Sequence, residues 1–168
     1  MRNRRAFLKK SGMLMLAGSI PASAISMVIK REKQPGNIVV TLYVDTRSIT
    51  NQNTSETCNF GQDPEIPNEE FTIQANIGDT ITWRGVSSVN ENDVVNIKSI
   101  NHEGGKNVFN QNVLIGDGEN PEKVVGKVVA ATGTPKRDHY KYKISFKVTN
   151  DGQNRNGTFH IDPKIEVH

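Results

Sequence analysis

From residue 37 to the C-terminus, hydrophobic and polar residues alternate with a period of two, and helical periodicity is rare. Alternation of this kind is typical of strands that bury one face and expose the other. The clearest run places Tyr142, Ile144, Phe146 and Val148 on one face, and lysines and a serine on the other. The pattern predicts strands over 37–46, 71–77, 80–84, 94–100, 141–148 and 159–167, with weaker candidates over 108–115 and 124–131.

Turns rich in Gly, Asn and Asp separate these segments. Seven or eight short strands punctuated in this way indicate an all-β fold, an antiparallel β-sandwich of the jelly-roll or cupredoxin-like kind. We expect residues 37–168 to form this one domain, because a chain of that length can enclose a two-sheet core. Pro163 interrupts the last strand, which should therefore lie at an edge or carry a bulge there. The predicted core contains six residues from three strands: Ile81, Trp83, Ile144, Phe146, Phe159 and Ile161.

The polar stretch 47–68 breaks the strand pattern and is long for a loop without structure of its own. Loops of that length are usually functional or disordered. Cys58, Phe60 and Ile66 are apolar residues that would pin this stretch to the domain. We therefore interpret 47–68 as a functional loop and as the candidate partner surface.

The N-terminal residues have the three parts of a secretory signal: a basic start, a short apolar stretch and the small-residue end Ala22-Ser23-Ala24. The pair Arg4 and Arg5, followed by Phe7, Leu8 and Lys9, resembles the twin-arginine signal of bacteria. A general secretory signal is the alternative interpretation.

This signal predicts a bacterial protein that is periplasmic or secreted, with the twin-arginine translocase as its partner during export. We expect residues 1–24 to be removed and residues 25–36 to be a linker, because the charged half of that segment ends in Pro35-Gly36. No cysteine stands directly after the apolar stretch, where a lipoprotein anchor would need one. No apolar run is long enough to span a bilayer, so we expect no stable membrane anchor.

The charge of the chain is concentrated in its N-terminal part. The 168 residues include 21 Lys and Arg and 18 Asp and Glu, a formal net charge of +3. Five of the basic residues stand in 1–24, which has no acidic residue, so 16 basic and 18 acidic residues remain. A domain without a basic excess argues against a nucleic-acid partner. The single cysteine, Cys58, excludes internal disulfides and multi-cysteine zinc or iron–sulfur sites.

Copper binding is the sharpest alternative chemistry, because residues 78–83 also resemble a cupredoxin strand. A type 1 copper site needs two His, one Cys and usually a weak axial Met. Here Cys58 stands in the early loop and no Met follows Met27. His102, His139 and His160 are scattered along the chain and are interpreted as surface residues. A cupredoxin-like periplasmic metal-binding protein is kept as the alternative function.

Other chemistry finds little support in the residue pattern. The sequence has neither a Gly-x-Ser-x-Gly nucleophile elbow nor a Gly-rich phosphate-binding loop. The adjacent pair Glu69-Glu70 would point to opposite faces of a strand. The loop 116–120 offers oxygen ligands for calcium, but too few for a full coordination shell. We therefore predict a protein that is not an enzyme and has no catalytic residue, cofactor or metal.

Four blocks of sequence stand in a fixed order: Tyr43–Thr46, Ile77–Ser87, Asn107–Asn110 and Phe159–Val167. In this order they resemble the inclusion-body protein family called PixA or AidA, over about residues 38–168. The matching motif residues are Asp45, Thr46, Gly78, Asp79, Thr80, Trp83, Arg84, Gly85, Phe109, Asn110, Asp162 and Pro163.

The resemblance implies a structural, storage or binding protein rather than an enzyme, because that family offers no reaction and no catalytic residues. We accordingly expect a protein that acts by self-assembly or by binding a partner or glycan. Glycan sites favour an exposed aromatic ring among polar residues, and Phe60, Phe109 and Tyr140 stand in polar surroundings. For Phe109 we favour a place in the core.

Overall fold

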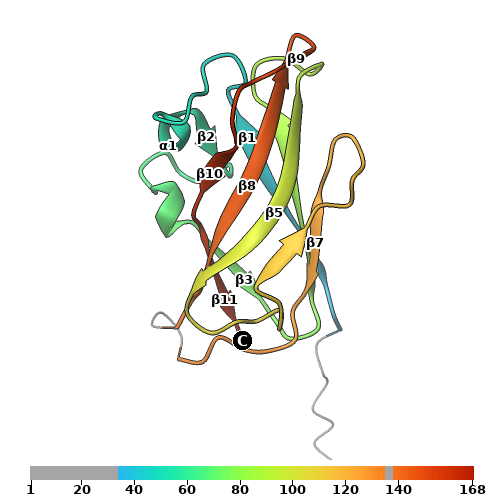
Figure 1. The fold of residues 1–168 in the computed structure, drawn as a ribbon. Helices are drawn as coiled ribbons and strands as arrows, with labels where there is room; N and C mark the ends of the chain where they lie inside the picture. Colours follow the sequence, from blue (N-terminus) through green and yellow to red (C-terminus); the bar gives the residue numbers. More distant parts are fainter. Residues whose placement is uncertain (1–33, 135–137) are drawn as a thin grey trace, which may run out of the picture. The chain divides into compact units, whose positions relative to one another are not determined.

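The computed structural model describes residues 34–134 and 138–168, which form two β-sheets packed on each other (Figure 1). The first sheet has the strand order β2 (Cys58–Asn59), β1 (Asn37–Val44), β4 (Thr80–Ser87) and β7 (Val124–Lys127). The second has the order β3 (Thr72–Ala75), β11 (Lys164–Val167), β8 (Tyr140–Asn150), β5 (Val94–Gly104) and β6 (Val113–Ile115). The predicted all-β sandwich is confirmed.

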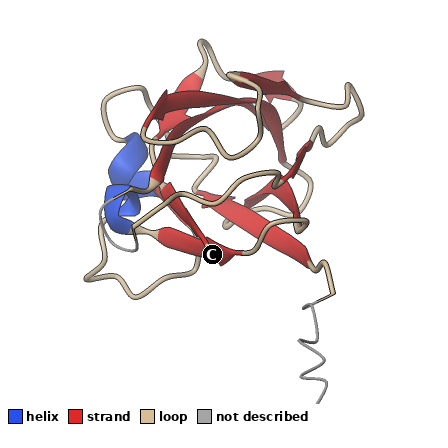
Figure 2. Ribbon diagram, turned by 90° about the horizontal axis from the view of Figure 1, so that it is seen from below, coloured by secondary structure: helices blue, strands red, loops and turns tan. Residues whose placement is uncertain are grey.

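Two further short strands, β9 (Gln153–Asn154) and β10 (Phe159–Ile161), pair with β8. Together with β11 they follow one another along the same side of β8, whereas β5 occupies its other side. Two short helices, α1 (Thr54–Thr57) and the 3₁₀ turn η1 (Asn68–Glu70), lie at one side of the sandwich (Figure 2). No helix in the described part of the chain is long and apolar enough to cross a membrane.

The sheets are mixed, which corrects the expectation of a wholly antiparallel sandwich. β1 runs parallel to β4 along its whole length, and β3 runs parallel to β11. Between β1 and β4 the chain passes through the other sheet as β3, so it re-enters the first sheet in its original direction. The weaker candidate strands are shorter than predicted, because only 113–115 and 124–127 of them join the sheets.

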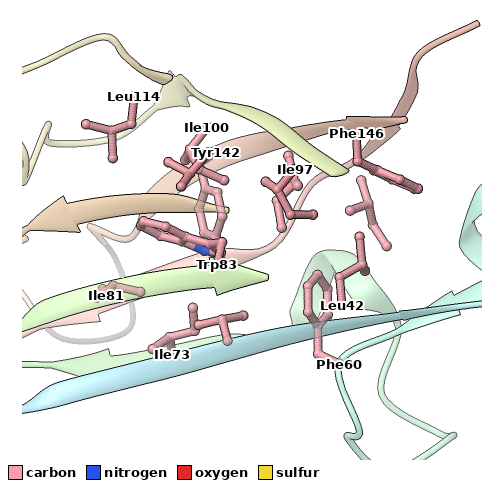
Figure 3. Close-up of a cluster of buried hydrophobic side chains, with 14 of the residues drawn as sticks. Leu42, Phe60, Ile73, Ile81, Trp83, Ile97, Ile100, Leu114, Tyr142 and Phe146 are labelled. Carbon is pink, nitrogen blue, oxygen red and sulfur yellow. The ribbon is translucent and has the colours of Figure 1, made fainter. Parts of the chain in front are cut away.

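All six residues predicted to share a core are buried in one hydrophobic cluster. Trp83 lies at its centre, with the ring edge-on to Phe109 and Tyr142 at centroid distances of 5.7 Å in each case. The Trp83 Nε1–H donates to the Tyr142 hydroxyl at 3.1 Å (Figure 3). The core is therefore aromatic and contains at least one buried polar contact.

Pro163 is buried in a break that divides the last predicted strand into β10 and β11. The predicted interruption is confirmed, but β11 lies between β3 and β8 rather than at an edge. The Pro163 carbonyl still accepts a hydrogen bond from the Tyr142 N–H at 3.3 Å. Proline has no N–H and cannot donate a hydrogen bond to a neighbouring strand. The break between β10 and β11 places Pro163 where no such bond is required.

Candidate functional site

The Gly78-Asp79-Thr80 block of the family motif is a structural turn. Gly78 has φ +95°, a left-handed conformation that favours glycine. The buried Asp79 carboxylate accepts from the Gly36 N–H at 2.7 Å and from the Asn76 N–H at 2.8 Å. This block therefore fixes the turn between β3 and β4 to the start of β1, where Thr80 pairs with Asn37.

Trp83, Gly85 and Phe109 belong to the core. A Cβ on Gly85 would lie 2.2 Å from Val95 Cγ1 and 2.9 Å from the Val95 carbonyl oxygen, so the two sheets approach too closely here for a side chain. Phe109 is buried, as favoured from the sequence. Asn110 next to it has φ +55°, which allows a tight turn.

Three motif residues reach the surface or the rim of the sandwich. Arg84 is exposed, and its Nε donates to Thr41 Oγ1 at 3.0 Å. Asp162 is exposed in the break before Pro163. Asp45 follows β1, and its carboxylate accepts from the N–H groups of Arg47 and Ser48, both at 3.1 Å. These residues shape turns and edges, and they do not converge on one site.

Thr46, by contrast, takes part in a buried polar cluster that ties four segments together at one end of the sandwich. Its Oγ1 donates to the buried Asp93 carboxylate at 2.5 Å and lies 2.8 Å from Ser87 Oγ. Asp93 also accepts from Asn150 Nδ2 at 2.7 Å and from the Asp151 N–H at 2.9 Å. Hydrogen bonds from Thr46 and Asp151 lower the pKa of Asp93 below its usual value, although burial acts in the opposite direction.

Sequence reasoning did not single out Asp93. It stands in the polar turn 90–93, and a lone acid in a turn carries no sign of which distant residues it contacts. The local signal that does exist is Asn90, whose Nδ2 lies 3.3 Å from the Asp93 carboxylate.

Beside this cluster lies a groove of about 720 Å³. Residues 49–52 of the long loop form one wall, and residues 150–156 around the β8–β9 turn form the other. Ile49 and Phe159, each 2% exposed, reach its floor from the core. Part of the loop that is predicted to be functional therefore borders this groove.

Side-chain amides dominate the walls of this groove. Within the described ranges, the amide groups of four lining residues have no hydrogen-bond partner in the protein: Asn51, Gln52, Gln153 and Asn156. Each amide can both donate and accept hydrogen bonds. These four amide groups thus offer the groove several hydrogen-bond donors and acceptors that have no partner in the described protein. The amides themselves are uncharged.

Arg155 joins the two walls. Its Nε donates to the Thr46 carbonyl at 3.2 Å, and its guanidinium also contacts the Arg47 carbonyl. Its backbone N–H donates to the Val148 carbonyl at 2.8 Å. The guanidinium therefore ties the start of the loop to the β8–β9 hairpin beside the groove.

The rest of the long loop is packed rather than open. Cys58 and Phe60 are buried, which confirms two of the predicted anchors, and Phe60 stacks on Phe71 at 4.7 Å. The prediction that Ile66 is the third anchor was wrong, because this residue is 43% exposed. Burial raises the pKa of the Cys58 thiol to about 12, so this cysteine is protonated and unreactive at neutral pH.

The rings proposed for glycan stacking are not available for it. Phe60, Phe109 and Tyr140 are all buried. Their polar sequence neighbours belong to turns, whereas the rings themselves point into the core. A sugar-stacking platform on these three residues is therefore excluded.

The histidines do not gather. His102 stacks on Tyr140 at 4.9 Å, His139 lies 3.9 Å from the Glu166 carboxylate, and His160 lies 3.1 Å from Ser145 Oγ. The residues that the structure describes contain no group of three or more His, Cys, Asp or Glu side chains placed to hold a metal ion.

The candidate calcium loop is occupied by internal contacts. The Asp117 carboxylate accepts from the N–H groups of Glu119 at 3.1 Å and Lys123 at 3.3 Å. The Lys123 ammonium lies 3.5 Å from Asp117 and 3.3 Å from Glu119. These contacts use the oxygen atoms that a calcium ion would need.

Neither protein-family models nor curated proteins match this chain. Among solved structures, the inclusion body protein PixA from Burkholderia cenocepacia superposes with a TM-score of 0.58 and 18% sequence identity, over 83% of this chain and 100% of that one. The chain shares the PixA fold. A cysteine protease inhibitor from Entamoeba histolytica superposes over 82% of this chain and 100% of its own, with a TM-score of only 0.32 and 6% identity.

The predicted export signal, including Arg4, Arg5, Phe7, Leu8 and Lys9, lies outside the described residues, as does most of the predicted linker 25–36. The described residues include all of the predicted domain 37–168 except residues 135–137, and its boundaries stay a prediction.

Proposed function

We propose that this protein is an exported, non-enzymatic member of the PixA family that acts by binding a partner. The shared fold and the four motif blocks, which stand in family order along the domain, support the assignment. Most motif residues form turns or pack in the core, so the family pattern specifies the fold rather than a binding site. The binding site is then a feature of this chain's own loops.

The groove between residues 49–52 and 150–156 is the proposed binding site, and a neutral carbohydrate is the proposed class of ligand. The observation that carries this proposal is the row of uncommitted side-chain amides along a hollow of about 720 Å³. That volume lies in the range of small-molecule sites. Sugar hydroxyls also both donate and accept, so amides match them, whereas an ionic ligand would favour a wall of one charge.

A glycan array with three forms of the protein tests this proposal. We expect the wild type to bind a defined set of neutral glycans and the variant Asn51→Ala/Gln153→Ala to lose that binding. The matched control is Asn92→Ala/Gln111→Ala, which removes two exposed amides outside the groove. Point substitutions are preferable to deleting the loop, because Cys58 and Phe60 belong to the core. Binding that survives in the groove variant, or that is lost equally in the control, would exclude the groove.

Export through the twin-arginine route is the second part of the proposal, and it rests on Arg4 and Arg5 with the small-residue end at 22–24. Replacing both arginines by lysine keeps the charge but should leave the precursor in the cytoplasm of a host bacterium. Arg2→Lys, just before the pair, is the matched control and should be exported. Normal export of the double variant would point to the general secretory route instead.

A further inference from the structure

β6 forms one edge of the second sheet and carries an unusual pair of side chains. Val113 and Ile115 point outward and are 46% and 76% exposed, while Leu114 between them is buried. Ile115 has the largest exposed fraction among the large hydrophobic residues described. An edge strand with two exposed apolar side chains is a surface on which another strand can pair.

The backbone of β6 is open at the same two residues. The Asn112 carbonyl accepts from the His102 N–H at 2.8 Å, and the Gly116 N–H donates to the Lys98 carbonyl at 2.9 Å. Hydrogen-bonded residues alternate along an antiparallel ladder, so Leu114 also faces its partner Ile100 on β5. The N–H and C=O groups of Val113 and Ile115 therefore point away from β5, and no residue in the described ranges bonds to them.

The edge strands β2, β3 and β7 are either shorter than the three residues of β6 or carry polar or charged exposed side chains. β2 has only two residues, and the exposed residues of β3 are polar. β7 carries the charged Lys127 beside the exposed Val125. Short edges and charged or polar side chains are common means of preventing unwanted pairing. β6 has neither a charge nor a proline.

We propose that β6 pairs antiparallel with β6 of a second copy of this chain, about a two-fold axis at Leu114. In this register Val113 of each copy faces Ile115 of the other. Val113 and Ile115 are two positions apart, so the two-fold axis brings each of them opposite the other residue in the second copy. The N–H and C=O groups of both residues then form hydrogen bonds across the interface. The exposed Val and Ile side chains of the two copies then cover one another on the outer face of the joined sheet.

The flanking residues favour a second copy as the occupant. The same register places Asp117 opposite Gln111 of the other copy, and Gly116 opposite Asn112, so no like charges meet at the ends of the paired strands. The interface contains none of the groove residues, so a test of the dimer is independent of a test of the proposed carbohydrate site.

Sedimentation equilibrium of the full chain tests the interface. We expect the wild type to show a monomer–dimer equilibrium and Ile115→Lys to weaken dimerisation at least tenfold, because two lysines then flank the two-fold axis. Ile77→Lys is the matched control, since Ile77 is 55% exposed in the turn before β4. A wild type that stays monomeric into the millimolar range would overturn the proposal, and so would an Ile115→Lys variant that associates as the wild type does.

Cysteine pairing tests the register. Paired residues in this ladder stand about 5.5 Å apart at Cα, within the reach of a disulfide. Mixing Val113→Cys chains with Ile115→Cys chains should give a cross-linked heterodimer on mild oxidation, whereas either variant alone should cross-link far less. Cys58 is buried and does not compete. Efficient cross-linking of Val113→Cys alone would indicate a different register and contradict the proposed dimer.

Discussion

Two tyrosines on β8 differ in the hydrogen bonding of their hydroxyl groups, and that difference gives a measurable prediction. Tyr140 and Tyr142 are both fully buried, lie on the same face of the strand and have ring centroids 5.8 Å apart. The Tyr142 hydroxyl accepts the Trp83 Nε1–H at 3.1 Å. The Tyr140 hydroxyl is buried without a hydrogen-bond partner among the described residues. Phenylalanine at either position removes one oxygen and keeps the ring.

The expected effects on the free energy of unfolding have opposite signs. Tyr142→Phe leaves the buried Trp83 N–H unpaired, which should cost about 1–3 kcal/mol. Tyr140→Phe removes a hydroxyl that was desolvated without compensation, so it should be neutral or should stabilise by about 1 kcal/mol. Because both changes delete the same atom from equally buried sites, the loss of packing contacts cancels in the comparison.

Urea unfolding followed by tryptophan fluorescence and by circular dichroism measures both values. An unchanged slope with a shifted midpoint would identify a change in stability rather than in the denatured state. If Tyr140→Phe destabilises the protein as much as Tyr142→Phe does, the difference in hydrogen bonding is not what distinguishes the two sites, and the assignment of partners is wrong.

Three further outcomes follow from the same core. Gly85→Ala should destabilise the domain by about 1–3 kcal/mol in urea unfolding, because the new methyl overlaps Val95, and an unchanged midpoint would contradict the close approach of the sheets. Cys58 should not react with a thiol reagent at pH 8 until the protein is unfolded, because burial raises its pKa to about 12; rapid reaction of the native protein would refute this. Stability should be steady between neutral pH and about pH 9 and should fall as the pH rises toward about 12. The thiol and the two core tyrosines have raised pKa values in the folded state, so the unfolded chain loses these protons first; a urea midpoint that rises over this range would have the wrong sign.

The period-two pattern predicted the strands and the core because burial of alternate residues is a local property of the sequence. Ile81, Trp83 and Phe146 could be assigned to one core from alternation alone. The pairing of strands is not local. Nothing in residues 37–44 indicates that they pair in parallel with 80–87, since that depends on the chain entering the other sheet in between.

The candidate site was predicted only in part for the same reason. The length and polarity of 47–68 marked it as a candidate loop, and Phe60 and Phe109 are buried as predicted for the anchor and the core. Ile66 was predicted to be an anchor but is exposed, because a hydrophobic residue in a polar stretch can face either the core or the solvent. The second wall of the groove, at 150–156, looked like an ordinary turn. Asp93, which fixes the loop end of the sandwich through Thr46 and Asn150, became visible only when the fold brought these segments together.

The central claim is that the groove between 49–52 and 150–156 binds a neutral sugar. Its most direct test is a titration of isotope-labelled protein with a panel of neutral hexoses and their disaccharides, followed by amide-resolved NMR. We predict saturable shifts at Ile49, Asn51, Gln153 and Asn156, with the strands of the opposite end unchanged. Shifts confined to other surfaces, or no saturable shift at millimolar sugar for any member of the panel, would contradict the account.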